Sequence, residues 1–202
     1  NLLTTSGAAI GLPRTFSVRT ENPPVSDLSW HFLESPTNDL VTGIGFADPT
    51  TGYAVTDGGS VYRSTDGGKT FIPRYKDLST TSLADVRAFG DTVYTVGARN
   101  IGSTTHFGLL RSIDAGVTFD LTNETTPLLY RNAMRRAPDG SVVGVAGGLF
   151  DKSYVFRYES RTGTLTQSAG IPGGNYLTTG VDISPTTTQN AVATFLGFPF
   201  TP

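Results

Sequence analysis

Two copies of one short turn motif constrain the fold of this chain more than any other feature. Residues 64–71 read Ser-Thr-Asp-Gly-Gly-Lys-Thr-Phe, and residues 112–119, which begin 48 residues later, read Ser-Ile-Asp-Ala-Gly-Val-Thr-Phe. In such a stretch the aspartate accepts hydrogen bonds from backbone N–H groups, and the glycine supplies the positive φ of a tight turn. Threonine and phenylalanine then begin a strand. Each copy therefore predicts a β-hairpin, and the spacing predicts a propeller or a solenoid.

Short apolar segments and turn signals recur around these hairpins. We expect four strands in each of three units, which span 40–82, 83–127 and 128–174. Asp-Gly pairs between apolar runs mark several of the turns, and one longer loop is expected at 99–106. The hairpin of the third unit has Arg161 in place of the aspartate. Its turn can still form, because glycine sets the backbone geometry and aspartate only adds hydrogen bonds.

A fourth unit, 175–202, ends after two expected strands, and the N-terminal segment 1–36 offers two more. Joining the two segments would complete a fourth blade and remove an exposed sheet edge. The predicted fold is therefore all-β, a propeller of about four four-stranded antiparallel blades in one domain, 1–202. The alternative is a fragment of a larger propeller.

Composition excludes several classes of function. The formal net charge of −2 and the pI near 5.6 leave no basic excess to drive binding to nucleic acid. The absence of cysteine excludes disulfides, thiolate catalysis and cysteine-ligated zinc. His31 and His106 lie far apart in sequence without a carboxylate-rich loop, and no glycine-rich loop has the context of a phosphate cradle, so neither a metal nor a cofactor is expected.

The chain also lacks any stretch close to the ~20 apolar residues of a membrane span. Abundant Gly, Ser and Thr with few lysines favour an extracytoplasmic protein, periplasmic, lumenal or secreted, from which a signal peptide has already been removed.

The two hairpins resemble the Asp box, or BNR repeat, of sialidases and many other propellers. The segment 45–71, with its Asp-Gly-Gly turn ahead of the hairpin, looks like a blade of the photosystem II assembly and stability factor family. The segment 181–193 is similar to blade openings of sortilin-like and xyloglucanase-like propellers. In Asp-box families the motif is a fold element on the blade rim, which implies a structural role for the motif residues. These are Ser64, Asp66, Gly68, Thr70, Phe71, Ser112, Asp114, Gly116, Thr118 and Phe119.

Charged residues on the expected first strands are the candidates for a site. Alternation places Asp85 with Arg87 on one face, and Arg131 with Arg135 on another. Arginine pairs suit carboxylate or phosphate ligands. Asp85 and Asp182 lie on equivalent first strands, where a xyloglucanase-like glycosidase would need two opposed carboxylates. We interpret these groups as solvated or structurally paired charges around a central channel.

The resulting hypothesis is a non-catalytic extracytoplasmic scaffold that docks on a protein, of the kind found in membrane-associated complexes. It follows from the lack of a recognisable catalytic set, including the Phe/Tyr-Arg-Ile-Pro signature of sialidases, and from the resemblance to assembly-factor blades. The alternative is a glycan-active propeller, either a lectin or a sialidase-like or xyloglucanase-like glycoside hydrolase. Its site would use Asp85, Arg87 and Arg135 at the channel mouth.

Overall fold

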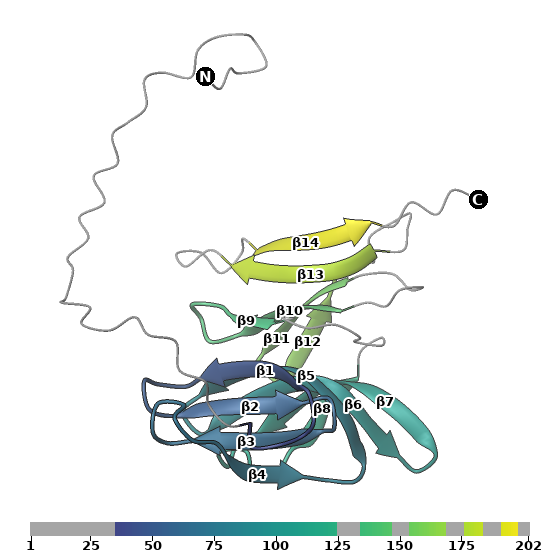
Figure 1. Ribbon diagram of the computed structural model, residues 1–202. Coiled ribbons are helices and arrows are strands. Elements are labelled where there is room, and N and C mark those ends of the chain that lie inside the picture. Colours follow the sequence, from purple (N-terminus) through teal and green to yellow (C-terminus); the bar gives the residue numbers. More distant parts are fainter. Residues whose placement is uncertain (1–34, 125–133, 147–153, 169–175, 184–190, 198–202) are drawn as a thin grey trace, which may run out of the picture. The chain divides into compact units, whose positions relative to one another are not determined.

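The computed structural model describes residues 35–124, 134–146, 154–168, 176–183 and 191–197, and every regular element in these ranges is a β-strand (Figure 1). The strands form three four-stranded antiparallel meanders and one antiparallel pair. This is a β-propeller built of four-stranded blades. No helix long and apolar enough to cross a membrane occurs in the described ranges.

Each blade follows the chain order from strand to strand. Blade 1 contains β1 (Val41–Phe46), β2 (Gly52–Thr56), β3 (Ser60–Ser64) and β4 (Ile72–Lys76). Blade 2 contains β5 (Thr80–Phe89), β6 (Thr92–Ile101), β7 (Thr104–Ser112) and β8 (Asp120–Glu124). Blade 3 contains β9 (Met134–Arg136), β10 (Val142–Ala146), β11 (Tyr154–Glu159) and β12 (Thr164–Gln167). The pair consists of β13 (Tyr176–Ile183) and β14 (Ala191–Gly197).

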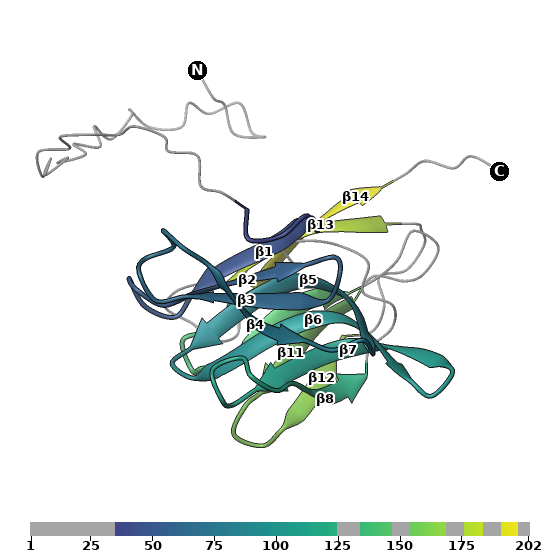
Figure 2. The ribbon, with the colours of Figure 1, turned by 60° about the horizontal axis from the view of Figure 1, so that its bottom comes forward.

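One expectation from the sequence, a long loop in blade 2, is wrong. The segment 99–106 is not a loop, because β6 continues to Ile101 and β7 begins at Thr104 (Figure 2). Asn100 pairs with Thr105 across the hairpin. Gly102, with a φ of 63°, forms part of the two-residue connection. The polar side chains that suggested a loop lie in an exposed hairpin, where cross-strand pairing does not require burial.

The fourth blade remains a prediction. Its two described strands, β13 and β14, pair with each other, with a register shift between Thr178 and Gly180. Residues 1–34, which would supply the missing strands, lie outside the described residues. Ring closure within 1–202 and the blade boundaries drawn from the sequence therefore stay predictions.

The two Asp hairpins, residues 64–71 and 112–119, have nearly identical hydrogen bonds. Ser64 donates from Oγ to Asp66 over 2.7 Å and accepts the N–H of Gly68 over 2.9 Å. The carboxylate of Asp66 then accepts the N–H and the hydroxyl of Thr70, at 3.0 and 2.7 Å. Ser112, Asp114, Gly116 and Thr118 repeat these bonds at 2.6 to 3.0 Å. Both aspartates are thus occupied in holding their own turns.

The third hairpin keeps its turn without the aspartate. Gly163 has a φ of 69°, and its N–H donates to the carbonyl of Glu159 over 2.9 Å. Glycine alone therefore provides the left-handed geometry at this position.

Blades 1 and 2 pack through an apolar cluster and a close backbone approach. Tyr53 and Val55 of blade 1 and Val86 of blade 2 are fully buried in this cluster. Gly43 and Gly45 of β1 face β5 so closely that an added Cβ would lie 2.9 Å from the Asp85 Cα and 2.6 Å from the Val86 carbonyl oxygen. Only glycine allows the two strands to approach to this distance.

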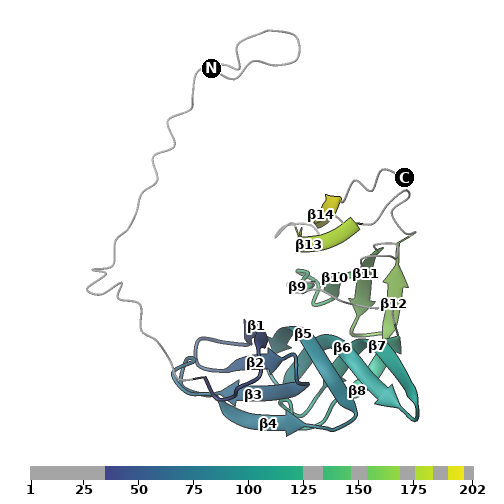
Figure 3. The same ribbon diagram turned by 45° about the vertical axis from the view of Figure 1, so that its right-hand side comes forward.

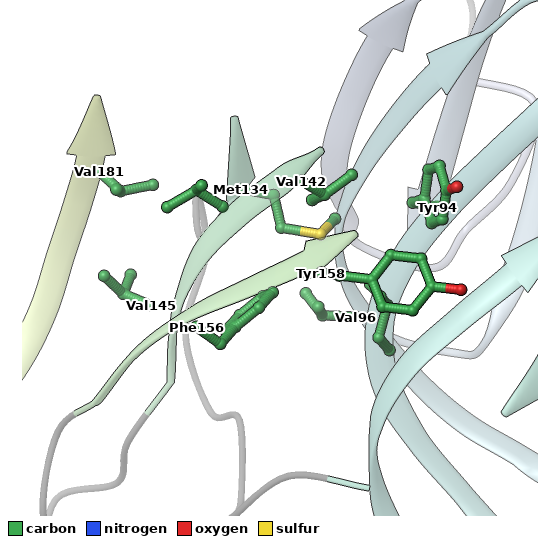
Figure 4. Packing of buried hydrophobic residues seen from close by; sticks show 10 residues of the cluster. Tyr94, Val96, Met134, Val142, Val145, Phe156, Tyr158 and Val181 are labelled. Atoms are coloured by element: carbon green, nitrogen blue, oxygen red, sulfur yellow. The ribbon is translucent and has the colours of Figure 1, made fainter. Parts of the chain in front are cut away.

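A second apolar cluster joins blade 2, blade 3 and β13 (Figure 4). The rings of Tyr94 and Tyr158 meet edge to face, with centroids 5.7 Å apart. Met134 and Phe156 fill the space between β10 and β6, and Val181 extends the cluster to β13. Figure 3 shows β9–β12 and β13–β14 from the side. The residues that link consecutive blades are therefore mainly aromatic and β-branched, as expected for packed sheet faces.

Replacing Ala115 by glycine should stabilise the protein. Ala115 occupies the position of Gly67 in the first Asp hairpin and has a φ of 58°, which strains any residue with a Cβ. We expect Ala115→Gly to raise the free energy of unfolding by about 1 kcal/mol, measured by urea denaturation. Ala54→Gly, in the regular strand β2, is the control and should lower it by roughly 0.5–1 kcal/mol. A lower free energy of unfolding in Ala115→Gly would contradict the conclusion that Ala115 is strained.

The Asp hairpins should make stability sensitive to acid. Hydrogen bonds from the hydroxyl and N–H of Thr70 hold the pKa of Asp66 well below its usual 3.8, and Thr118 does the same for Asp114. Because the folded pKa is lowered, this stabilisation is present above the unfolded pKa and is lost as the pH falls below about 4 towards the folded pKa. The double variant Asp66→Asn/Asp114→Asn should therefore be less stable than the wild type at about pH 7. The difference should shrink at about pH 2.5 in urea denaturation, and a difference independent of pH would refute the assignment.

Candidate functional site

Asp85, the acidic candidate from the sequence, is buried at the junction of blades 2 and 3. It lies on β5 and is only 1% exposed. Its carboxylate accepts hydrogen bonds from the N–H of Val86 at 2.8 Å, from the Arg87 guanidinium at 2.9 Å and from the N–H of Met134 at 2.9 Å. A buried carboxylate needs such donors to offset the loss of water.

Arg87 completes this contact from the same strand. Its Nη1 forms the ion pair with Asp85, and its Nε donates to the carbonyl of Met134 over 2.9 Å. The two side chains thus bind both the N–H and the carbonyl of one residue, as a neighbouring strand would. We call Asp85, Arg87 and the Met134 backbone the Asp85 clamp. Its position explains how the three-residue strand β9 is held against β5.

The electrostatics of the clamp fit a structural role. Burial raises the pKa of Asp85, while the Arg87 charge and the N–H of Met134 act in the opposite direction. Burial likewise lowers the pKa of Arg87, and the Asp85 carboxylate counteracts this. Each charge therefore compensates the desolvation of the other.

Of the remaining candidates from the sequence, Arg135 also binds the Met134 carbonyl, and Asp182 lies next to Arg135. Arg135 donates from Nη1 to the Met134 carbonyl over 2.9 Å, and its Nε lies 3.8 Å from the Asp182 carboxylate. The Asp182 side chain is 85% exposed, unlike the buried Asp85. Arg131 lies outside the described residues. The structure thus brings Asp85, Arg87 and Arg135 together, but around a backbone group of the protein.

Catalysis by opposed carboxylates would require both acids to reach one substrate. Asp85 has its oxygens occupied by backbone and guanidinium donors, and it lines neither of two clefts found along blades 2 and 3. Among the described residues, no group of three His, Asp or Glu side chains could hold a metal ion. This geometry favours a role for the clamp in joining blades.

A different exposed feature lies where blade 1 passes into blade 2. The turn between β4 and β5 places Leu78 in solvent, with 93% of its surface exposed. Next to it, the extended β6–β7 hairpin carries Ile101, which is 51% exposed. The N–H of Asn100 donates to the carbonyl of Ser79 over 2.7 Å, which ties the hairpin to the turn. Two apolar side chains are therefore presented on adjacent connections.

Hydrogen bonds brace this turn and hairpin together. Arg99 of β6 binds Asp77 through Nη2 at 3.1 Å, Ser79 through Nε at 3.1 Å and the carbonyl of Phe119 through Nη1 at 3.0 Å. Asp77 also accepts the N–H of Ser79 over 2.8 Å. These bonds lower the pKa of Asp77, with the Ser79 N–H as the main cause. We call Asp77, Leu78, Ser79, Arg99 and Ile101 the braced rim.

Sequence reasoning missed the braced rim. The segment Asp77-Leu78-Ser79 has the Asp-x-Ser pattern of a side-chain-capped turn, which was a usable signal. Its partner Arg99 comes from the segment that was expected to be a loop. The contact between them could not be read from spacing, because it depends on how β5 pairs with β6.

The clamp should be essential for stability. Asp85→Ala would leave the Arg87 charge and the Met134 N–H buried without an acceptor, so we expect a loss of about 3–5 kcal/mol in the free energy of unfolding. Asp182→Ala removes an exposed carboxylate and should change it by less than about 0.5 kcal/mol. Urea denaturation measures both. Equal stability of the two variants would show that the clamp contributes nothing.

Comparisons with known proteins gave similarities among solved structures alone. The chain matches no protein-family model and no curated protein sequence. Among solved structures it is similar to YCF48 from Cyanidioschyzon merolae, with 14% identity, a TM-score of 0.39, and coverage of 81% of this chain and 66% of that chain. YCF48 bound to D1 peptide is similar at 14% identity, a TM-score of 0.37, and coverage of 74% and 59%. The computationally designed Ika4 protein has 11% identity, a TM-score of 0.49, and coverage of 82% and 96%.

The chain therefore spans less than two thirds of the length of both YCF48 chains. At these identities and TM-scores, the similarities carry no argument about activity or ligand. The β-propeller assignment follows from the three four-stranded meanders and their face-to-face packing.

Proposed function

We propose that this protein is a non-catalytic binding scaffold that docks on another protein through the braced rim. The observation that carries the proposal is the 93% exposure of Leu78 on a turn fixed by Asp77, Ser79 and Arg99. An apolar side chain held in water by a rigid turn gains hydrophobic energy on docking, and little conformational entropy is lost.

The position of the rim supports this role. In each meander the connections alternate between the two ends of the blade, so the β4–β5 turn and the β6–β7 hairpin lie at the end opposite the Asp hairpins. Loops carried by a rigid β-scaffold are a common place for recognition surfaces. Leu78 and Ile101 would act as the apolar anchors. The polar hairpin residues around them would form the solvent-exposed edge of the interface.

The proposal includes the setting inferred from the sequence. An extracytoplasmic location fits the composition of the chain, with many Gly, Ser and Thr residues and few lysines. A partner in a membrane-associated complex follows from the resemblance of segment 45–71 to assembly-factor blades. The xyloglucanase-like form of the glycan-active alternative needs free carboxylates, and the oxygens of Asp85 are already bound within the clamp.

Photo-crosslinking in the source organism tests the docking surface. A photoreactive residue at position 78 should give a discrete adduct with one protein, and the same residue at position 72 should not. Ile72, on β4, is similarly apolar and 59% exposed, but it lies outside the rim. The same adducts at both positions, or none at position 78, would rule out the rim as the docking surface.

Binding to the partner identified in this way should depend on the anchors. We expect Leu78→Asp and Ile101→Asp each to weaken it about 30-fold, because a hot-spot side chain contributes about 2 kcal/mol, and Ile72→Asp should leave it unchanged. Hydrolysis of sialosides or xyloglucan by the wild-type protein, lost in Arg135→Ala, would instead establish the glycan-active alternative.

A further inference from the structure

A cleft of about 260 Å³ lies between blades 2 and 3, along the end that carries the Asp hairpins. Three arginines line it: Arg111 from β7, Arg136 from β9 and Arg161 from the turn between β11 and β12. None of its lining residues is acidic. Three positive charges from two strands and one turn therefore meet in one small space.

These charges lack counter-ions within the described part of the chain. No ion pair joins Arg111, Arg136 or Arg161 to a carboxylate there. The Nε of Arg111 is also buried and has no hydrogen-bond acceptor among the described residues. A buried N–H without an acceptor costs free energy comparable to a lost hydrogen bond, which a bound anion would recover.

The blade 3 carboxylates beside the cleft bind other groups. Asp139 accepts the N–H and hydroxyl of Ser141 at 3.0 and 2.7 Å and pairs with Arg157. Glu159 lies 3.9 Å from the Nε of the same arginine.

No carboxylate of the described residues lines the arginine cleft itself. Asp139 and Glu159 line a neighbouring cleft that shares Ser160 and Arg161 with it but does not include Arg111 or Arg136. Asp120 lies opposite Arg111 across β7 and β8, and no ion pair joins these two described side chains.

The cleft is also preorganised. The Arg136 guanidinium lies over the Phe89 ring, 4.5 Å from its centroid, which fixes the long side chain by a cation–π contact. The Tyr94 hydroxyl bonds with the side chains of Ser160 and Arg111, which places it beside the arginines. Burial raises the pKa of Tyr94, which keeps its hydroxyl protonated and able to donate.

Blade 1 contains the equivalent pair in different surroundings. Tyr53 faces Arg63 across β2 and β3 as Tyr94 faces Arg111 across β6 and β7, and the Nε of Arg63 is likewise buried without an acceptor among the described residues.

The charges around the two pairs differ. One acidic residue, Asp91, and one arginine, Arg74, act on Tyr53. The cleft beside Tyr94 is lined by two further arginines, Arg136 and Arg161, and by no acidic residue of the described ranges. The second position is therefore the more positive of the two.

We propose that the arginine cleft binds a tetrahedral oxyanion, phosphate or sulfate, either free or as the terminal group of a larger ligand. Three guanidinium groups match a charge near −2 better than the single charge of a carboxylate, and each can donate two parallel hydrogen bonds to an oxyanion. The hydroxyl of Tyr94 lies beside them as a further donor. This site is independent of the braced rim and lies at the other end of the blades.

Calorimetric titration of the whole protein at constant ionic strength tests the proposal. Sodium phosphate and sodium sulfate should bind saturably to one site, and sodium acetate at least about tenfold more weakly. Phenyl phosphate distinguishes the two sources: tighter binding than phosphate indicates a terminal ester group, and equal or weaker binding indicates the free ion. Equal responses to phosphate, acetate and chloride would overturn the proposal.

Matched variants locate the binding. Arg161→Gln changes an exposed turn residue and should weaken phosphate binding at least about tenfold without unfolding the protein. Arg63→Gln removes the blade 1 counterpart of Arg111 and should leave phosphate binding unchanged. Unaltered binding in Arg161→Gln, or an equal loss in Arg63→Gln, would show that the cleft is not the site.

Discussion

The contact of Asp85 with the Met134 backbone determines how blade 3 joins blade 2. Strand β9, described from Met134 to Arg136, pairs with β10 over these three residues. Asp85 accepts its N–H, and Arg87 binds its carbonyl, so the register of β9 against β5 is fixed by directional bonds. Removing these charges from water costs free energy. Hydrogen bonds to the carboxylate oxygens and from the guanidinium group offset that cost. Removing either partner would leave the other charge buried and unpaired, so the fold depends on the intact clamp even though the apolar cluster around Met134 supplies the hydrophobic energy.

The two described blade junctions solve the same packing problem differently. Between blades 1 and 2, Gly43 and Gly45 let the innermost strands approach until backbone meets backbone. Between blades 2 and 3, charged side chains cross the gap instead. A glycine junction allows close packing, but it has no directional bonds that fix how one blade lies against the next. A charged junction has such bonds, at the cost of removing charged groups from water. Sequence repeats in a propeller are therefore compatible with blade interfaces of distinct character.

Local chemistry explains what could be predicted from the sequence. Asp66 and Asp114 bind groups within four residues, so the motif alone predicts their turns. Asp85 and Met134 are 49 residues apart, and no pattern in either segment indicates that they meet. Alternation did place Asp85 beside Arg87, but it could not show that both would bind a backbone group. The braced rim was missed for a related reason, because Arg99 reaches Asp77 only when the polar segment after it forms a hairpin.

The two ends of the blades carry different chemistry because different forces hold them. At the end with the Asp hairpins, three arginines from β7, β9 and the β11–β12 turn line one cleft, and among the described residues none of them pairs with a carboxylate. At the opposite end, Arg99 forms an ion pair with Asp77, and the apolar side chain of Leu78 is exposed. An arginine that is paired within the fold stiffens its surroundings, whereas an arginine without a counter-ion attracts a ligand. Arginine thus braces the proposed docking surface at one end and lines the proposed anion site at the other, and its role depends on whether the fold supplies a carboxylate partner.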